Sequence, residues 1–413
     1  MGEVVLVVRE YNGEKDCLEV EEVERNCEVG PSGKMSLFTH MLGDPLSRIR
    51  HSPAFLMLVA EMKIGAEKKI VGLIRGCIKT VTCGKKVSRV GKNGHQYATD
   101  DNHNRSLPIY TKLAYILGLR VSPSHRRMGI GLKLVTRVEQ WFRENNAEYS
   151  YMATEKDNEA SLTLFTHRCG YNKFRTPSIL VQPVFAHPVK VSKGVTIFPL
   201  TPSEAETLYR RQFSTVEFFP RDIDSVLNNK LNLGTYVAVS SNTYSSQSWP
   251  GVEGFLSDLP KSWAVLSIWN NKEVFMLEVC GASRIKRALA KTTRIVDRVF
   301  PWIGIPSVPN VFRPFGSHFL YGLGGNGPHA VNLIKALCGF AHNLARKHGC
   351  SIVATEVSGQ EPLRVGIPHW KRLSCEEDYW CMKRLGEDYS DGSVGDWTKC
   401  PPGFSVFVDP REL

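Results

Sequence analysis

One short segment combines glycines and arginines in a pattern that suits phosphate binding. Residues 126–131 read RRMGIG and stand between an apolar stretch and an amphipathic one. The start of a helix presents unpaired backbone N–H groups and a partial positive charge, so it attracts phosphate. Gly129 and Gly131 would let phosphates approach the backbone, and Arg126 and Arg127 would add charge. The spacing therefore predicts a pyrophosphate site, which on this ground alone a nucleotide would also fit.

A second segment strengthens the functional reading of the first. Asn158 is followed by Ser161, Phe165 and then Gly170-Tyr171. Together the two segments resemble the GCN5-related N-acetyltransferase (GNAT) superfamily, whose signatures are Arg/Gln-x-x-Gly-x-Gly/Ala and, on a later helix, Asn-x-x-Ala-x-x-Leu-Tyr closing on Gly-Phe. The resemblance implies transfer of an acetyl group from acetyl-coenzyme A to an amine, with no metal. It assigns to the cofactor Leu119, Val121, Arg126, Arg127, Met128, Gly129, Ile130, Gly131, Asn158 and Phe165.

The rest of the chain carries a wider resemblance, to the plant HOOKLESS group of N-acetyltransferases. Its marks are the segments Cys27–Lys34, Phe218–Lys230 and Gly395–Lys399. The resemblance implies a nuclear regulator of hormone-controlled differential growth.

Acetyl transfer to an amine needs a base for the ammonium proton and an acid for the leaving thiolate. Tyr115 stands eleven residues before Arg126, where the resemblance implies a tyrosine in members that acetylate protein N-termini. Glu155 and Glu61 are carboxylates that could act through water. We predict Tyr115 and Glu155 as catalytic residues. A tyrosine packed in the sheet and carboxylates that are only strand-end charges are the alternatives.

Two departures from the family pattern leave a second function open. Phe165 stands where the tyrosine that protonates the thiolate is expected, and the interval to Gly170 is one residue longer than usual. Ala153 stands where N-terminal acetyltransferases carry a histidine base. A regulatory scaffold that binds acyl-coenzyme A with weak or no catalysis is therefore the rival hypothesis.

The elements that must position these residues follow from hydrophobic periodicity. An order β-α-β-β-β-α-β-α is predicted, with strands at 4–8, 55–61, 70–81, 113–121 and 149–154, and helices at 14–28, from 129, and from 161. Polar residues 84–106 are predicted to form a loop. Farther on, residues 263–269 and 273–279 predict a β-hairpin, and residues 284–298 a helix with a basic stripe. That stripe is either a solvated face or a nuclear-import or anion-binding patch.

The chain also contains an internal repeat. Gly129 is followed by a helix and a strand ending Ala-Thr-Glu155, and Gly327 is followed by a helix and a strand ending Ala-Thr-Glu356. A length of 413 residues exceeds the usual size of a single core. We therefore predict an α/β (α+β) protein of tandem GNAT-like domains, each a mixed, mostly antiparallel sheet with flanking helices. Residues 1–180 would form the acetyltransferase domain. Residues 195–413 would form a degenerate copy, because Pro328 removes a backbone donor from its helix start.

Charge is distributed unevenly along the chain. Residues 1–61 carry 6 Lys/Arg and 11 Asp/Glu, whereas residues 62–137 carry 16 and 3. The basic segment suits the phosphates of acetyl-coenzyme A, and the acidic first helix predicts a protein acceptor with a cationic amine. A pair of solvated faces is the alternative. The net charge of +11 alone does not predict direct nucleic-acid binding, since no nucleic-acid-binding signature accompanies it.

Composition narrows the cellular setting. The 11 cysteines are scattered without a Cys-x-x-Cys pair, so neither disulfides nor a zinc site is predicted. No signal peptide is predicted, because the first residues contain no cationic leader, and no membrane span is predicted, because no run of about 18 apolar residues occurs. We expect a protein of the nucleus or cytoplasm.

Overall fold

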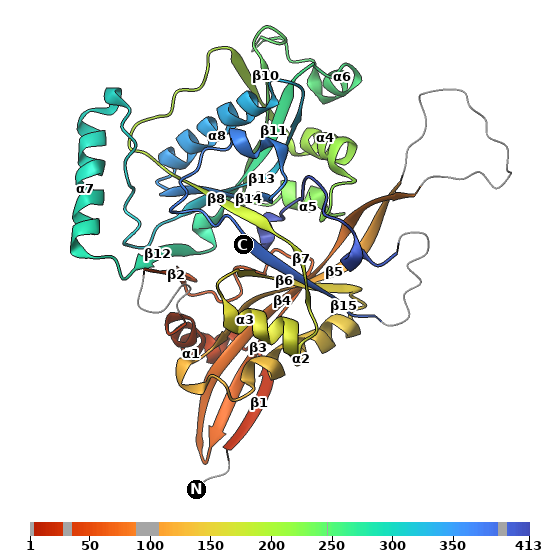
Figure 1. The fold of residues 1–413 in the computed structure, drawn as a ribbon, viewed down its shortest axis with the longest axis vertical. Helices are drawn as coiled ribbons and strands as arrows, with labels where there is room; N and C mark the ends of the chain where they lie inside the picture. Colours follow the sequence, from red (N-terminus) through yellow and green to blue (C-terminus); the bar gives the residue numbers. More distant parts are fainter. Residues whose placement is uncertain (1–3, 28–34, 88–106, 246, 387–394) are drawn as a thin grey trace, which may run out of the picture.

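The computed structural model describes residues 4–27, 35–87, 107–245, 247–386 and 395–413, which form an elongated molecule with one large sheet in each half (Figure 1). The first sheet has seven strands in the order β1-β3-β4-β5-β6-β15-β7. The second has six, in the order β8-β14-β13-β11-β10-β9. A two-stranded sheet, β12-β2, lies between them at one edge (Figure 1). Helices flank both large sheets, which confirms the predicted α/β class.

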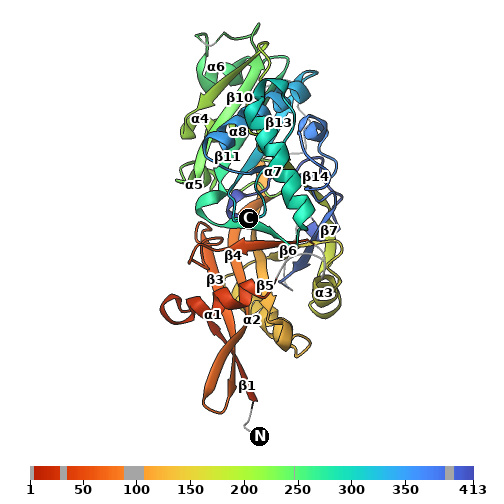
Figure 2. The same cartoon turned by 90° about the vertical axis from the view of Figure 1, so that its left-hand side faces the viewer.

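The first sheet is covered by helices on both faces. Its strands are β1 (Val4–Glu10), β3 (Ala54–Ile64), β4 (Glu67–Val87), β5 (Leu107–Val121), β6 (Tyr149–Glu155), β15 (Asp378–Arg384) and β7 (Asn172–Arg175). Helix α1 (Gly13–Arg25) packs on one face through Val20 and Val23. Helices α2 (Ile130–Glu144) and α3 (Glu159–Leu162) follow on the other face (Figure 2), where Leu134 and Val138 are fully buried. The predicted order of elements is thus confirmed, except that β2 (Ser36–His40) was not foreseen.

The second sheet repeats this plan. Its strands are β8 (Pro177–Pro183), β14 (Ile352–Ser358), β13 (Ser317–Asn326), β11 (Trp263–Asn270), β10 (Asn232–Ser240) and β9 (Val195–Leu200). Its helices are α4 (Pro202–Phe213), α5 (Ile223–Leu227), α6 (Gly251–Ser257), α7 (Arg284–Val299) and α8 (Ala330–Lys347). The capping box of Thr201 and Glu204 begins α4. Helix α8 lies against the sheet, with Ile334, Leu337 and Ala341 fully buried.

Each half contains one parallel strand pair that separates after four residues. In the first half, β5 pairs with β6 over residues 113–116 and 149–152. In the second, β13 pairs with β14 over residues 317–320 and 352–355. A glycine with positive φ, Gly118 at 62° or Gly322 at 59°, follows each paired stretch and coincides with a register shift toward the neighbouring strand. The repeat seen in the sequence is therefore a repeat of this strand geometry.

The two halves exchange strands. Strand β8, which follows β7 directly, leaves the first sheet and pairs with β14 of the second over residues 177–183. Strand β15, near the other end of the chain, returns to the first sheet and inserts between β6 and β7. The predicted domain limits, 1–180 and 195–413, therefore do not coincide with the limits of the two sheets.

One hydrophobic core joins the halves. Tyr149 and Tyr151 of β6 pack in the same buried cluster as Phe218, Trp380 and Trp397. Phe218 lies between these rings, with centroids 5.4 Å from Tyr151, 4.9 Å from Trp380 and 5.0 Å from Trp397. Aromatic side chains bury large apolar areas, so this core stabilises the contact between the halves.

The predicted hairpin of residues 263–279 is wrong. Strand β11 pairs with β10 and β13, whereas β12 (Met276–Cys280) pairs with β2 of the first half. The short helical turn Asn271–Glu273 directs the chain away from β11. Residues 84–87 extend strand β4, and the rest of the predicted loop, 88–106, lies outside the described residues.

Candidate active site

The strand separation in the first half leaves part of β5 without a parallel neighbour. Pairing with β6 ends at Ile116, so Leu119 and Val121 lie beyond it. Both are partly exposed, and their carbonyl oxygens accept bonds from Arg120 at 3.2 Å and from Arg126 at 3.3 Å. An unpaired strand edge offers backbone groups to an extended ligand. An amide-bearing chain such as pantetheine fits this edge.

The segment after β5 forms an open backbone cradle. Arg127 and Gly129 both have positive φ, 64° and 77°, which turns successive backbone groups inward as in anion-binding nests. Gly129 is the N-cap of α2 and supplies no side-chain cap, so the first amides of the helix stay available. Arg126, Arg127 and Met128 are exposed. The cradle lies at the positive end of a 15-residue helix and suits the pyrophosphate of acetyl-coenzyme A.

Glycine is favoured at the two glycine positions of this cradle for different physical reasons. A Cβ on Gly129 would meet no atom within 4 Å, so glycine is favoured there by its backbone conformation. A Cβ on Gly131 would lie 3.3 Å from Leu164 of the following helix, so close packing also matters. Ile130, between them, is buried under the sheet and fixes the start of the helix.

The equivalent site in the second half is closed. A Cβ on Gly327 would lie 1.8 Å from the carbonyl oxygen of Lys261, and the amide of His329 is already bound to Ser262 at 3.2 Å. Backbone therefore fills the space that is open before α2. This packing explains physically why the C-terminal copy is degenerate.

Two residues predicted to bind the cofactor also stabilise the local structure, one as a helix cap and the other as a buried core residue. The side chain of Asn158 accepts a bond from the amide of Ser161 and so caps α3. Phe165 is 1% exposed and packs edge-on against Tyr171 at 5.2 Å in the core. It lies in a π-helical segment, Thr163–Arg168, which accommodates the extra residue noticed in the sequence.

Tyr115 lies on the sheet face that meets the second half. Its ring stacks on Tyr151 with centroids 4.5 Å apart. Burial, then the charge of Glu412, raises the pKa of Tyr115 well above its ordinary value, with Glu356 and Asp378 adding to the rise. Tyr115 is therefore a neutral hydroxyl at physiological pH. It can donate or relay a proton, but it is not an anionic base.

Several carboxyl groups gather on this same face. Residues directly opposite in neighbouring strands share a face, and Asp378 of β15 lies opposite Glu155 of β6. Glu155 is exposed, whereas Asp378 is buried and its Oδ1 has no hydrogen-bond partner among the described residues. Glu356 reaches the face from β14 and accepts a 2.9 Å bond from Trp380 Nε1. Tyr115 and Glu155 thus share a sheet face with two acids that the sequence did not predict, and it is these two, Glu356 and Asp378, whose charges act on Tyr115.

These added acids have pKa values near neutrality. Burial, with the neighbouring Asp378, raises the pKa of Glu356 to about 8. Burial also raises the pKa of Asp378 to about 6. A carboxyl with a pKa near the working pH can both take and return a proton. The signal for Glu356 was present in the sequence, since it ends the second Ala-Thr-Glu.

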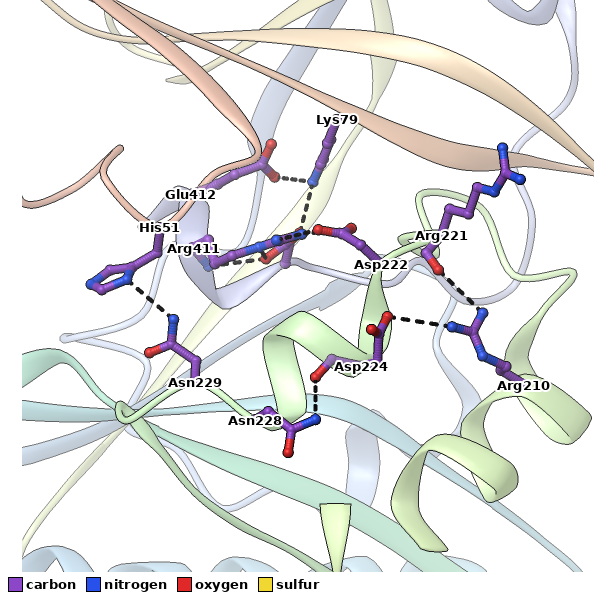
Figure 3. A network of polar contacts seen from close by, with 11 residues as sticks. His51, Lys79, Arg210, Arg221, Asp222, Asp224, Asn228, Asn229, Arg411 and Glu412 are labelled. Carbon is purple, nitrogen blue, oxygen red and sulfur yellow. Dashed lines mark hydrogen bonds and ion pairs between the residues drawn. The ribbon is translucent and has the colours of Figure 1, made fainter. Parts of the chain in front are cut away.

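A buried ionic network is connected to this face through Tyr151, and Figure 3 shows its members Lys79, Arg411 and Glu412. Tyr151 donates a 2.6 Å hydrogen bond to Glu412, which also binds Lys79 of β4 at 2.5 Å. Lys79 lies 3.6 Å from Asp409, and Asp409 binds Arg411 at 2.7 Å. Buried charges are tolerated when they are paired in this way. The network therefore fixes the tyrosine pair to the last residues of the chain.

The acidic first helix presents part of the charge that the sequence suggested, because Glu14 and Glu22 are exposed whereas two other acids are buried in ion pairs. Asp16 is buried against Arg9 at 2.7 Å, and Glu24 is buried against Arg75 at 2.6 Å. Glu61, the further carboxylate considered, is also buried and binds Arg9. The ion pairs of Asp16 with Arg9 of β1 and of Glu24 with Arg75 of β4 fasten α1 to the sheet.

Two further findings bound the chemistry. The described residues contain no group of three His, Cys, Asp or Glu side chains that could hold a metal ion. Within the same ranges, no helix has the length and apolar character needed to cross a membrane.

An uncapped helix start beside a separated parallel strand pair defines the class of protein, a coenzyme A-dependent acetyltransferase fold. The sequence pattern of the Acetyltransferase (GNAT) family matches residues 40–171. The chain is 64% identical to the probable N-acetyltransferase HLS1 of Arabidopsis thaliana, over 98% of this chain and all of that protein. It is 40% identical to the acetyl transferase GW6a of Oryza sativa subsp. japonica, over 100% of this chain and 99% of that protein. The chain belongs to the GNAT family of N-acetyltransferases.

One solved structure shares the fold over most of this chain. The N-myristoyltransferase of Saccharomyces cerevisiae, solved with bound myristoyl-CoA, superposes with a TM-score of 0.51 at 9% identity. The match covers 92% of this chain and 79% of that one. At this identity the similarity shows the fold alone.

Proposed function

We propose that this chain transfers the acetyl group of acetyl-coenzyme A to a cationic amine of a protein, either a lysine side chain or an N-terminus. One observation carries the proposal. The open cradle before α2 and the acid-rich face around Tyr115 belong to the same pair of separating strands, β5 and β6. A phosphate site and a proton-transfer site are thereby supplied on either side of one strand separation.

The acids favour a positively charged acceptor. The unpartnered oxygen of Asp378 and the exposed carboxylate of Glu155 lie opposite each other on β15 and β6. A buried acceptor atom without a partner is costly, and an ammonium group would satisfy it. This carboxyl pair would attract a cationic acceptor in addition to the acids of α1 that stay exposed.

Glu356 is the proposed general base. Its side chain is partly exposed, and one carboxylate oxygen accepts a hydrogen bond from Trp380. Its charge also raises the pKa of Tyr115. In its ionised form it would take a proton from the ammonium, and the free amine would then attack the thioester carbonyl. As the tetrahedral intermediate collapses, the neutral Tyr115 hydroxyl would pass a proton to the departing sulfur and take the second proton of the acylated nitrogen, so that the thiol and the amide leave and Tyr115 is neutral again. The second half thus contributes a base to the site of the first.

Activity on peptides tests the proposal directly. The full chain is mixed with acetyl-coenzyme A and with matched peptides that offer a lysine, a free N-terminus, or neither. Thiol release is measured, and mass spectrometry locates the acetyl group. We expect release with one of the two amine-bearing peptides and none with the blocked one. Acetyl-coenzyme A binding by calorimetry without release from any amine would contradict catalysis.

The same result would favour the rival function, a regulatory scaffold that binds acyl-coenzyme A. Its supporting observation is Phe165, which occupies the place expected for a thiolate acid yet is buried against Tyr171. If Tyr115 also fails to supply a proton, neither of these two positions provides an acid for the thiolate. Binding without turnover is then the expected behaviour.

The proposed setting is the nucleus, in hormone-controlled differential growth, and it is supported by the HOOKLESS resemblance. A fluorescent fusion of the full chain, imaged in seedling cells, tests the compartment. Exclusion from nuclei would contradict it.

A further inference from the structure

Helix α7 attaches to the molecule through its polar side. Asp297 accepts bonds from the amide of Ala186 at 2.7 Å and pairs with His187 at 2.6 Å. Arg294 donates to the carbonyl oxygen of Val184 at 2.6 Å. Ala290 and Asp297 are the buried residues of this helix. A surface helix normally buries an apolar stripe, so α7 is oriented the opposite way.

The apolar side of α7 consequently faces solvent. Figure 1 shows the helix at the edge of the molecule, packed along one side only. Ile285 is 81% exposed, Leu289 63%, Ile295 50% and Val299 54%, and Trp302 in the following turn is 75% exposed. Exposed apolar patches of this extent mark interaction sites. The stripe requires a partner that the described chain does not supply.

The spacing along the stripe indicates what kind of partner fits. Successive residues at intervals of three and four form a coiled-coil seam. They are Ile285, Ala288, Thr292, Ile295 and Val299, with the exposed Leu289 beside them, and the helix ends at Val299. The small residues Ala288 and Thr292 would allow another helix to approach closely.

One edge of the seam is uniformly basic. Arg284, Lys291 and Arg298 recur every seven residues and are all exposed. None of the three forms an ion pair within the described residues. Seven residues of helix rise about 10.5 Å, so these cations would meet carboxylates spaced one heptad apart.

We propose that the outward face of α7 binds an acidic amphipathic helix of another protein. That helix would place apolar residues on the seam and Glu or Asp opposite Arg284, Lys291 and Arg298. Antiparallel pairing of α7 with a second copy would bring the basic edges together, which is unfavourable. A bilayer needs no heptad register, whereas the three cations are in register.

Two synthetic peptides of 21 residues test the proposal on the full chain by fluorescence anisotropy. Both carry Leu on the seam, and their flanking positions are all Glu in one and all Lys in the other. We expect the Glu peptide to bind at least about 10-fold more tightly, with affinity that weakens as salt rises. The triple variant R284E/K291E/R298E should reverse this preference. The matched variant K190E/K335E/K347E, with the same charge change on exposed residues elsewhere, should not.

Other occupants have their own outcomes. The apolar variant I285S/L289S/I295S should lose Glu-peptide binding while keeping its thermal unfolding temperature, because these side chains are exposed. Equal binding of both peptides, or binding unchanged in the two α7 variants, would overturn the proposal. So would retention on vesicles of phosphatidylcholine and phosphatidylserine without peptide binding. Self-association that the apolar variant abolishes, again without peptide binding, would assign the face to a second copy instead.

Discussion

At the scale of single residues, the site combines groups that titrate with groups that cannot. Tyr115 and Tyr151 are held neutral by burial, and Tyr151 donates to Glu412. Glu356 and Asp378 have pKa values raised toward neutrality by the same burial. Proton uptake therefore belongs to the carboxyls, whereas the tyrosines can only donate or relay.

Replacement of Tyr115 by Phe isolates its hydroxyl. The stack on Tyr151 is retained, so acetyl-coenzyme A affinity and the unfolding temperature should change little. If the hydroxyl protonates the sulfur, kcat should fall about 100-fold, the lower range for acid–base catalysis. Steady-state thiol release and calorimetry separate the two effects. An unchanged kcat and pH profile would reduce Tyr115 to a packing residue.

Glu356→Gln tests the base through pH dependence. A base must be ionised, so kcat/KM of the unmodified chain should rise with pH until about 8, where Glu356 loses its proton. The Gln variant should lose that rise and be at least about 100-fold slower at pH 8. Asp378→Asn is a companion variant, since loss of this neighbouring carboxylate should lower the pKa of Glu356 and move the rise to lower pH without removing it. A pH profile of E356Q that matches the unmodified chain would contradict the assignment.

The same variant makes a stability prediction that does not depend on activity. The folded pKa of Glu356 lies above its ordinary value of 4.5, so the folded state binds the extra proton. Its contribution is fully present below about pH 4.5 and is lost as pH rises through about 8. Glu356→Gln should therefore flatten the decline of unfolding free energy over this window. Parallel denaturation curves at several pH values measure it.

At the scale of elements, the two halves differ most clearly in the backbone before their long helices, α2 and α8. Arg127 and Gly129 hold an open nest before α2, whereas Gly327 before α8 is packed against Lys261. The residues at the first site are exposed, so changing their charge should leave folding intact.

R126E/R127E should weaken acetyl-coenzyme A binding by about 10-fold or more, because two cations near the phosphates become anions. K190E/K347E makes the same charge change on exposed residues of the second half and should leave affinity unchanged. Calorimetry at two salt concentrations provides the measurement. Equal affinities of the two variants for acetyl-coenzyme A would contradict the assignment of this cradle as the phosphate-binding site.

At the scale of the whole molecule, the sequence predicted what is local and missed what is distant. The strands, α2 and the cradle follow from periodicity and glycine spacing, although β4 and β5 extend well beyond their predicted bounds. The longer interval before Gly170 marks the place of the π-helical turn but did not predict it. Pairing of β12 with β2, or of β15 with β6, depends on which distant edges are free. No local pattern encodes that choice. Glu356 was missed as a site residue for the same reason, since its neighbours come from separate segments.

Strand exchange makes a prediction about cooperativity. Residues 1–195 alone would lack β15, which pairs with both β6 and β7 and buries Trp380, Cys381 and Met382. Residues 195–413 alone would lack β8, the edge partner of β14. We therefore expect neither fragment to fold alone and the full chain to unfold in one calorimetric transition, with equal calorimetric and van't Hoff enthalpies.

A matched control restores the missing strand by joining residues 376–386 to residue 176 through a Gly/Ser linker. This fragment should recover dispersed amide signals in NMR spectra if strand loss is the cause. Cooperative unfolding of fragments 1–195 and 195–413, each on its own, would show instead that the two domains fold independently of the exchanged strands.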